Sequence, residues 1–238
     1  MIPLVYDQVN GWGKDDEFFL ALLKKIDIKT MADLGCGTGR LTTYFAQQGY
    51  QITAIDPNEE AIHVAKSKPH TENVTWIVGD SSNLQTAAYD AVIMTANVAQ
   101  VFLTEESWHH LLTDVYRALK PGGHFIFDTR NPLAKVWEKW QLDDTPDKAI
   151  DPETDDPLEI WTTYDGFTND VFTFYETVKN AHTKEDVVRL KMQLIFREKE
   201  TIEHNLLQAG FSAINIYEDW EFEQATALAN SFVFHCIK

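Results

Sequence analysis

The sequence has few cysteines, few positive charges and no long apolar run, and each shortage excludes a class of protein. Its 238 residues include two cysteines and eight scattered histidines, which do not suggest a disulfide framework or a metal site. The 20 lysines and arginines are outnumbered by 37 aspartates and glutamates, and the net charge of -17 disfavours nucleic acid as a partner. No apolar run could span a bilayer, and no signal peptide is evident, so we expect a cytoplasmic protein without membrane contact.

The most informative stretch is Met31–Arg40, M-A-D-L-G-C-G-T-G-R, in which an apolar strand pattern leads into three glycines at alternate positions. Glycine adopts positive φ angles easily, and without a Cβ it lets a ligand approach the main chain. The dinucleotide fingerprint G-x-G-x-x-G fails here, because its third glycine would fall at Arg40. The pattern D-x-G-x-G-x-G, which starts at Asp33, fits at every position. A plain strand-to-helix turn is the structural alternative.

Two further acids follow predicted strands in the same way. Asp56 comes after a strand predicted over Gln51–Ile55, about 20 residues beyond the glycines, where a ribose-binding carboxylate is expected. It is equally suited to cap a helix predicted over Pro57–Ser67. Asp80 follows a strand predicted over Asn73–Val78, although Gly-Asp-Ser-Ser is also a turn signal. Because the carboxyl ends of parallel strands meet at one edge of a sheet, we expect these acids to converge.

With these motifs the chain resembles the class I S-adenosylmethionine-dependent methyltransferases, whose first motif has the form D-x-G-x-G-x-G. The phrases R-A-L-K-P-G-G-H-F-I-F-D and L-L-Q-A-G-F resemble the family's entry into its fifth strand and its last helix-to-strand turn. The resemblance implies S-adenosyl-L-methionine as cofactor and S-adenosyl-L-homocysteine as product. It places Asp80 at the adenine amino group, Ser81 at the adenine ring and Asn97 beside the sulfonium. The predicted cofactor-binding residues are Asp33, Gly35, Cys36, Gly37, Gly39, Asp56, Pro57, Asp80, Ser81 and Asn97.

Strand and helix patterns alternate up to residue 132, which predicts a parallel sheet with helices on both faces. The resemblance implies an α/β, Rossmann-like fold with a seven-stranded, mostly parallel sheet in the order 3-2-1-4-5-7-6 and an antiparallel seventh strand. We expect residues 1–132 and 199–238 to form this core. In similar methyltransferases an N-terminal segment folds over the cofactor, and Tyr6 and Trp12 are placed to do so here.

Residues 133–198 interrupt the alternation, and we predict that they form an inserted, small antiparallel β lid over the substrate. Turn residues occur at Asp165-Gly166 and at Thr168-Asn169-Asp170. The last strand alternates cleanly, with Arg197 among its outward-facing residues. The aromatic residues of the inserted strands could line a pocket or enclose a cationic substrate, or they could form the lid's own core or a dimer contact. They are Trp161, Tyr164, Phe172, Phe174 and Tyr175. The expected elements are a helix over Leu133–Trp140, an acidic loop, and strands over Leu158–Tyr164, Val171–Lys179 and Val187–Arg197.

These patterns lead to a functional hypothesis. We expect methyl transfer from S-adenosylmethionine to a small-molecule acceptor by in-line displacement, in a monomer or homodimer, with alignment as the main contribution of the protein. The acidic loop is either simply solvated or forms a collar that favours amine acceptors. Catalytic residues are not assigned; His124, Tyr164 and Asp128 are the candidates if a general base exists. The alternatives are a methyltransferase acting on RNA or protein, which the acidic balance disfavours for RNA, and a non-catalytic cofactor-binding regulatory module.

Overall fold

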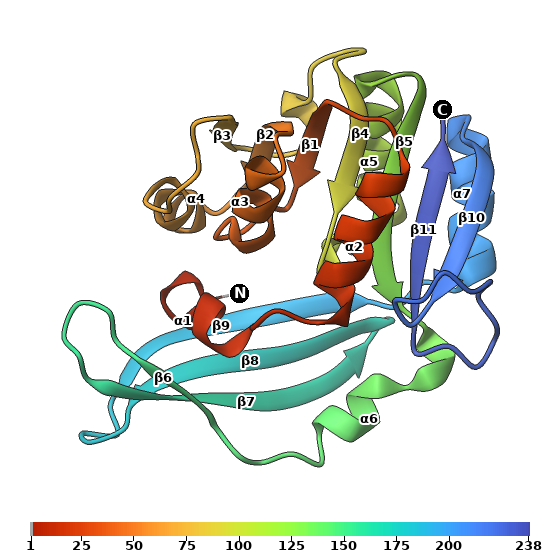
Figure 1. Cartoon of the computed structure of the whole chain (residues 1–238). Helices are drawn as coiled ribbons and strands as arrows, with labels where there is room; N and C mark the ends of the chain where they lie inside the picture. Colours follow the sequence, from red (N-terminus) through yellow and green to blue (C-terminus); the bar gives the residue numbers. More distant parts are fainter. Residues whose placement is uncertain (1) are drawn as a thin grey trace.

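The computed structural model describes residues 2–238 and contains two sheets, a larger one in the core and a smaller one beside it (Figure 1). The strands of the larger sheet are β1 (Thr30–Leu34), β2 (Gln51–Asp56), β3 (Val74–Val78), β4 (Tyr89–Met94), β5 (Leu119–Arg130), β10 (Ser212–Glu218) and β11 (Ser231–Ile237). The helices of the core are α2 (Lys14–Lys25), α3 (Arg40–Gln47), α4 (Glu59–Lys66), α5 (Glu105–Ala118) and α7 (Lys199–Ala209), with the 3₁₀ turns η1 (Ser81–Asn83) and η2 (Val98–Val101).

The strand order of the larger sheet is β3-β2-β1-β4-β5-β11-β10. β11 pairs antiparallel with both β5 and β10, and the other neighbouring strands are parallel. When β10 and β11 are counted as the sixth and seventh strands, this is the predicted order 3-2-1-4-5-7-6 with its antiparallel seventh strand. The prediction of an α/β, Rossmann-like fold is therefore confirmed.

Helices cover both faces of the larger sheet and bury its apolar side chains. On one face Trp108 of α5 packs edge-on against Phe127 of β5, with ring centroids 5.8 Å apart. On the other face the buried rings of Phe19 in α2 and Phe45 in α3 belong to a second cluster. Full burial of one such side chain contributes about 1.5–3 kcal/mol. Because both faces are covered, the central strands contain apolar runs that are buried on both sides, and residues 91–94 of β4 are fully buried.

The start of α4 differs from the prediction. The helix begins at Glu59 rather than at Pro57, because the Asn58 side chain caps it by accepting the Ala61 N–H at 3.2 Å. Asp56 is therefore not the cap of this helix, and the capping alternative for Asp56 is wrong.

The turn expected before the fifth strand is also different. Leu119 and His124 pair with β4 residues only two positions apart, so residues 120–123 form a bulge inside β5. The ammonium of Lys120 bonds to Asp90 Oδ1 of β4 at 2.7 Å. This ion pair connects the bulged segment to β4, so the segment remains part of the sheet.

Residues 133–198 form the smaller sheet with a short helical segment before it. Its antiparallel order is β6-β7-β8-β9. The three predicted strands are present, and β6 is an additional strand within the predicted acidic loop. The predicted helix is divided at Lys135, whose φ of 46° does not fit a right-handed helix. The elements are η3 (Pro132–Ala134), α6 (Val136–Trp140), β6 (Asp147–Ile150), β7 (Pro157–Thr168), β8 (Val171–Asn180) and β9 (Asp186–Ile195).

One of the two predicted hairpin turns is a bulge. The register between β7 and β8 shifts after Tyr164, so Asp165-Gly166 lies within the strand. The chain reverses at Asn169 and Asp170, which both have positive φ angles, 48° and 65°, as two-residue hairpin turns require. The second predicted turn is thus confirmed, and the first is wrong because a glycine with positive φ also suits a bulge.

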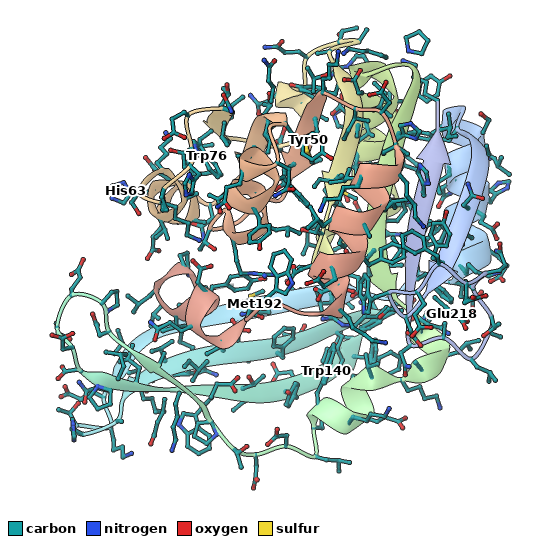
Figure 2. All side chains as sticks on the ribbon, viewed as in Figure 1. Tyr50, His63, Trp76, Trp140, Met192 and Glu218 are labelled. Atoms are coloured by element: carbon teal, nitrogen blue, oxygen red, sulfur yellow. The ribbon has the colours of Figure 1, made fainter. Side chains whose placement is uncertain are left out.

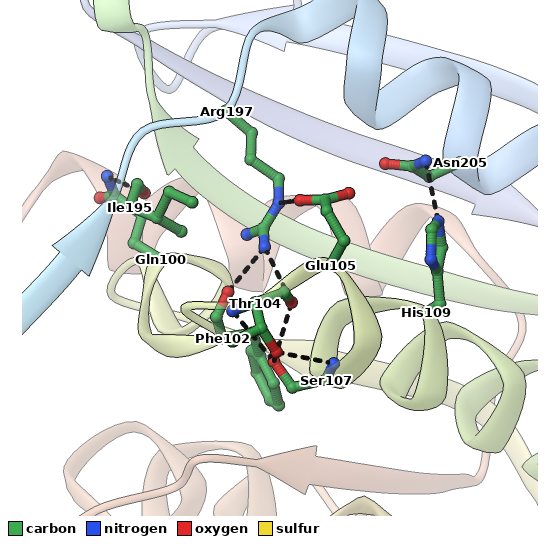
Figure 3. Close-up of polar contacts among 9 residues, drawn as sticks. All are labelled: Gln100, Phe102, Thr104, Glu105, Ser107, His109, Ile195, Arg197 and Asn205. Carbon is green, nitrogen blue, oxygen red and sulfur yellow. Dashed lines mark hydrogen bonds and ion pairs between the residues drawn. The ribbon is translucent and has the colours of Figure 1, made fainter. Parts of the chain in front are cut away.

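Arg197 faces inward, contrary to the prediction, and is 7% exposed. β9 ends at Ile195, so strand alternation no longer applies two residues later. Arg197 Nε donates to Glu105 Oε1 at 3.1 Å, and Arg197 Nη2 donates to the Phe102 carbonyl at 2.7 Å (Figure 3). The guanidinium also lies over the Trp108 ring, 5.0 Å from its centroid. These contacts fasten the end of the inserted segment to the start of α5.

The smaller sheet lies across the carboxyl ends of β4 and β5, which point toward it (Figure 1). An unpredicted helix, α1 (Pro3–Val9), sits between the two sheets. Ile2 and Val5 pack against Ile160 and other apolar residues of the smaller sheet. On its other side, the Asp7 carboxylate accepts a hydrogen bond from Thr38 Oγ1 at 2.6 Å and pairs with Lys68. α1 therefore connects the core to the inserted segment.

Within residues 2–238, no group of three or more His, Cys, Asp or Glu side chains could hold a metal ion. No helix in the same range is long and apolar enough to cross a membrane.

Candidate functional site

The glycine turn joins β1 to α3 and is fixed by hydrogen bonds from its own main chain. The Gly35 N–H donates to the Ile55 carbonyl at 2.7 Å, and the Gly37 N–H donates to Asp56 Oδ2 at 2.8 Å. Gly35, Gly37 and Gly39 have φ angles of 79°, 56° and 71°, a region that favours glycine. The turn therefore exposes main chain at the carboxyl end of β1, directly beside the end of β2.

Packing within the protein explains two of these glycines. A Cβ at Gly39 would lie 2.4 Å from the Trp76 ring, and a Cβ at Gly35 would lie 2.6 Å from Val98 Cγ2. Trp76 belongs to β3 and Val98 to η2, so neighbouring segments close around the turn. Cys36 lies half-buried within it, and burial raises the pKa of its thiol.

Two acids lie side by side at the ends of β1 and β2. Asp33 is 1% exposed, and burial raises the pKa of its carboxyl to about 7, although the Thr42 hydroxyl donates to its Oδ2 at 2.6 Å. The charge of Asp56 also raises the pKa of Asp33, so the two carboxyls are close in space. Asp56 Oδ1 accepts the Asn58 N–H at 2.9 Å, and the exposed Pro57 follows it. Of the three acids predicted to converge, Asp33 and Asp56 therefore lie together.

The third acid, Asp80, lies one strand further out, after β3. Its exposed carboxylate accepts hydrogen bonds from the Ser82 hydroxyl at 2.6 Å and the Ser82 N–H at 2.9 Å, which lower its pKa. The neighbouring Ser81 is buried, and its hydroxyl donates to Asp114 Oδ2 of α5 at 2.8 Å. Asp80 and Ser81 thus shape the turn after β3 and leave the acid accessible.

Strained backbone follows β4 at the predicted sulfonium position. Ala96 and Asn97 both have positive φ angles, 57° and 64°, which is unusual for two successive residues other than glycine. The Asn97 N–H donates to Asp128 Oδ2 of β5 at 2.9 Å. Such strain costs about 1–3 kcal/mol per residue and is concentrated at functional sites. The adjacent ends of β4 and β5 are therefore a candidate centre.

Three oxygen atoms around these strand ends are buried and have no hydrogen-bond partner among residues 2–238. They are Asp33 Oδ1, Asn97 Oδ1 and Asp128 Oδ1. Burial raises the pKa of Asp128 to about 7. An unpaired buried acceptor is costly, and a cationic ligand with N–H donors would satisfy it. This acceptor-rich set fits a cofactor that carries an ammonium and a sulfonium group.

The three candidates for a general base lie in different places. Asp128 is beside Asn97 at the candidate centre. Tyr164 lies on the smaller sheet, with its ring centroid 6.1 Å from that of Phe172. His124 lies at the other end of β5, where its Nδ1 is 2.9 Å from His235 Nε2. His124 is therefore too remote from the strand ends to act there.

The aromatic residues of the inserted strands divide between the two faces of the smaller sheet. Ile160 packs on the side of α1, and alternation places Tyr164 and Phe174, which pair across the strands, on that same inner side. Trp161 and Tyr175 face the other way, and the Arg189 guanidinium lies 4.5 Å from the Tyr175 centroid. Trp161 and Tyr175 therefore cannot line a pocket toward the core.

The N-terminal residues also separate. Tyr6, on α1, is half-buried, and the charges of Arg40 and Asp128 act on its hydroxyl, whose pKa burial raises. Trp12 instead packs on Tyr44 of α3, with ring centroids 4.2 Å apart. Of the two aromatics predicted to fold over the cofactor, Tyr6 is the one that the structure brings to the strand ends.

Sequence reasoning missed Arg130 and Gln100. Arg130 ends β5, two residues after Asp128, and its Nη1 donates to Gln100 Oε1 at 2.8 Å. Strand alternation puts Asp128 and Arg130 on one face of β5. The place of Arg130 beside Asp128 could therefore have been predicted once the end of the strand was known. Nothing in the local sequence points to Gln100, which is 1% exposed and comes from η2.

Comparison with known proteins agrees with this arrangement. Residues 31–123 match the family model described as "Methyltransferase domain". The YqeM protein of Bacillus subtilis (strain 168) is 25% identical over 68% of this chain and 65% of its own length. The "Malonyl-[acyl-carrier protein] O-methyltransferase" of Pectobacterium atrosepticum is 31% identical over 54% of this chain and 51% of its own length. The chain thus spans less than two thirds of these relatives.

The solved structures show the same fold. CalS10, an amino pentose methyltransferase from Micromonospora echinaspora solved with S-adenosylmethionine bound, superposes with a TM-score of 0.68. The match covers 95% of this chain and 92% of CalS10 at 16% identity. The D-x-G-x-G-x-G turn, the strand order and the matched family model agree in identifying residues 31–123 as a methyltransferase domain of the class I type, whose cofactor is S-adenosylmethionine.

Proposed function

We propose that this protein transfers a methyl group from S-adenosylmethionine to a small-molecule acceptor. The observation that carries the proposal is the cover over the carboxyl ends of β4 and β5. α1 and the smaller sheet together form it, and Arg197 fastens it to α5. A covered site keeps water away from the reacting groups and suits acceptors that fit beneath the cover.

The cofactor would be held by the residues at the strand ends. Asp56 would accept hydrogen bonds from the ribose hydroxyls, since each carboxylate oxygen retains a free lone pair beside its main-chain donor. Asp80 and the Ser81 amide would meet the adenine, and the glycine turn with Asn97 would hold the methionine part. When bound, S-adenosylmethionine supplies a methyl group that its positive sulfur activates.

The chain's own contribution would be position and exclusion of water. The strained main chain at Asn97, fixed by Asp128, orients an amide beside the place where the acceptor must approach. Correct alignment of two reactants can contribute about 7–11 kcal/mol to catalysis. Asp128 has a buried, unpaired oxygen and a pKa of about 7, so it is suited to take a proton from an acceptor at neutral pH.

The acceptors named for two similar proteins support a small substrate. One relative is named for malonyl groups on a carrier protein and the other for an amino pentose. The net charge of -17 argues against RNA as the acceptor. An acceptor carried on a protein is the second candidate, which the first of these names favours.

We also propose that residues 133–198 act as the substrate lid on a core formed by residues 1–132 and 199–238. Because Ile2 and Val5 pack on the smaller sheet, removing the whole insertion would expose them. Substitution of Tyr164 on the inner face is therefore a better probe, with Trp161 on the outer face as the matched control. Tyr164→Ala should lower methyl transfer and leave cofactor binding intact, whereas Trp161→Ala should change neither.

The proposed function is tested in two steps. S-adenosylhomocysteine should raise the melting temperature of the protein, and NAD should not. A library of small acceptors is then screened for release of S-adenosylhomocysteine. Binding without release from any small acceptor or carrier-bound substrate would favour the regulatory alternative, and stabilisation by NAD would refute the cofactor assignment.

A further inference from the structure

Arg130 places a largely buried positive charge between the core and the inserted sheet. Burial lowers the pKa of its guanidinium, and the nearby charge of Asp128 opposes that effect. The guanidinium has five N–H donors, yet its one hydrogen bond within residues 2–238 is that from Nη1 to Gln100 Oε1. No carboxylate of the described residues lies within ion-pair distance of it. The guanidinium of Arg130 therefore has further N–H donors that a ligand could use.

The guanidinium is nevertheless held in place by three elements. Gln100, from η2, is 1% exposed, and its Nε2 donates to the Ile195 carbonyl at the end of β9 at 3.2 Å. That bond orients the Gln100 amide so that its oxygen faces Arg130. The ring of Trp140, from α6, lies 4.8 Å from Arg130 Cζ, and Figure 2 shows Trp140 where the smaller sheet meets α6. A guanidinium fixed in this way is a rigid fork rather than a mobile surface charge.

Arg130 lies at the right separation from the candidate centre. It follows Asp128 by two residues on the same face of β5, and Asp128 bonds to the Asn97 N–H. Two residues of strand span about 7 Å, in the direction of the inserted sheet. An acceptor about the size of one aromatic ring could thus place its nucleophile near Asn97 and a second polar group on Arg130.

A planar guanidinium binds carboxylate and phosphate oxygens through two parallel hydrogen bonds. We propose that the methyl acceptor carries such an oxyanion group and that Arg130 binds it, which names a substrate class for the proposed methyltransferase and rests on that function. Arg130 is thus the acceptor-binding residue, and Gln100 positions it. No acid of residues 143–156 forms an ion pair with Arg130, and solvent and salt screen the charges of the exposed acids among them.

The first test uses the wild-type protein saturated with S-adenosylhomocysteine and measures the binding of four matched probes by calorimetry. The probes are benzoate, phenyl phosphate, benzamide and benzylamine. We expect one of the two anions to bind at least tenfold more tightly than benzamide, and the tighter anion distinguishes carboxylate from phosphate. Equal binding of anions and benzamide, or preferential binding of benzylamine, would overturn the proposal. Failure to bind S-adenosylhomocysteine would instead refute the proposed function.

The second test compares Arg130→Gln, Arg130→Lys and Arg189→Gln. Arg189→Gln removes one positive charge from the outer face of the smaller sheet and serves as the matched control. We expect Arg130→Gln to weaken anion binding roughly 10- to 100-fold, Arg130→Lys to weaken it less, and Arg189→Gln to leave it unchanged. S-adenosylhomocysteine affinity should stay the same in all three variants. A loss of that affinity in the folded Arg130→Lys variant would place Arg130 at the cofactor and overturn the proposal. If Arg130→Gln does not fold, the binding of the four probes to the wild-type protein still tests the proposal.

Discussion

Replacing Asp33 by asparagine should stabilise the protein without cofactor at high pH. Asp33 is 1% exposed, and burial raises its pKa from 3.8 to about 7, so ionisation opposes folding. A shift of this size corresponds to about 4 kcal/mol, present in full above pH 7 and absent below pH 3.8. Asparagine carries no charge, and its oxygen can still accept the Thr42 hydroxyl. Its amide nitrogen would replace the unpaired Oδ1 and cost about 1–3 kcal/mol.

The pH dependence separates these two effects. The ionisation cost in the wild type is about 1.5 kcal/mol at pH 5 and about 4 kcal/mol at pH 8, whereas the cost of the unpaired amide is the same at both. The free energy of unfolding of Asp33→Asn, relative to wild type, should therefore rise by about 2–3 kcal/mol between pH 5 and pH 8. Urea unfolding at both pH values measures it, with Asp27→Asn at an exposed position as the control. An equal difference at both pH values would show that Asp33 does not hold a raised pKa.

Three further predictions concern the cofactor turn and the histidine pair between β5 and β11. Asp56→Ala should weaken S-adenosylhomocysteine binding by about 1.5–3 kcal/mol, and unchanged affinity in calorimetry would remove the ribose assignment. Gly37→Val puts a β-branched residue at a φ of 56° beside the proposed ligand. This variant should not bind the cofactor, although it should still melt cooperatively. Retained binding would mean that the cofactor lies elsewhere. Burial lowers the pKa of His235 from 6.5 to about 4, so its contribution to stability is lost as pH falls through this range. His235→Leu should reduce the acid sensitivity of the free energy of unfolding by about 3 kcal/mol, and an unaltered pH profile would contradict this.

The sequence by itself determined the fold class of the core and the place of the candidate site. Strictly local features carried that information: three glycines that permit positive φ, apolar runs that can be strands only when both faces are covered, and acids directly after those runs. Strand ends in a parallel sheet meet at one edge, so the order along the chain was enough to bring Asp33 and Asp56 together. The alternation of β9 likewise predicted which of its residues face inward, up to the point where the strand ends.

The tertiary structure decided what covers the site and which side chains face it. Helix α1 has seven residues and no side-chain cap at its start, so its stability comes from packing on the smaller sheet rather than from its own sequence. The inward turn of Arg197 depends on acceptors more than 90 positions away, at Phe102 and Thr104. Gln100 likewise donates to Ile195, 95 positions away, and accepts from Arg130, 30 positions away. Such contacts arise only when distant segments pack together, because a local pattern fixes which residues share a face and not what that face will meet.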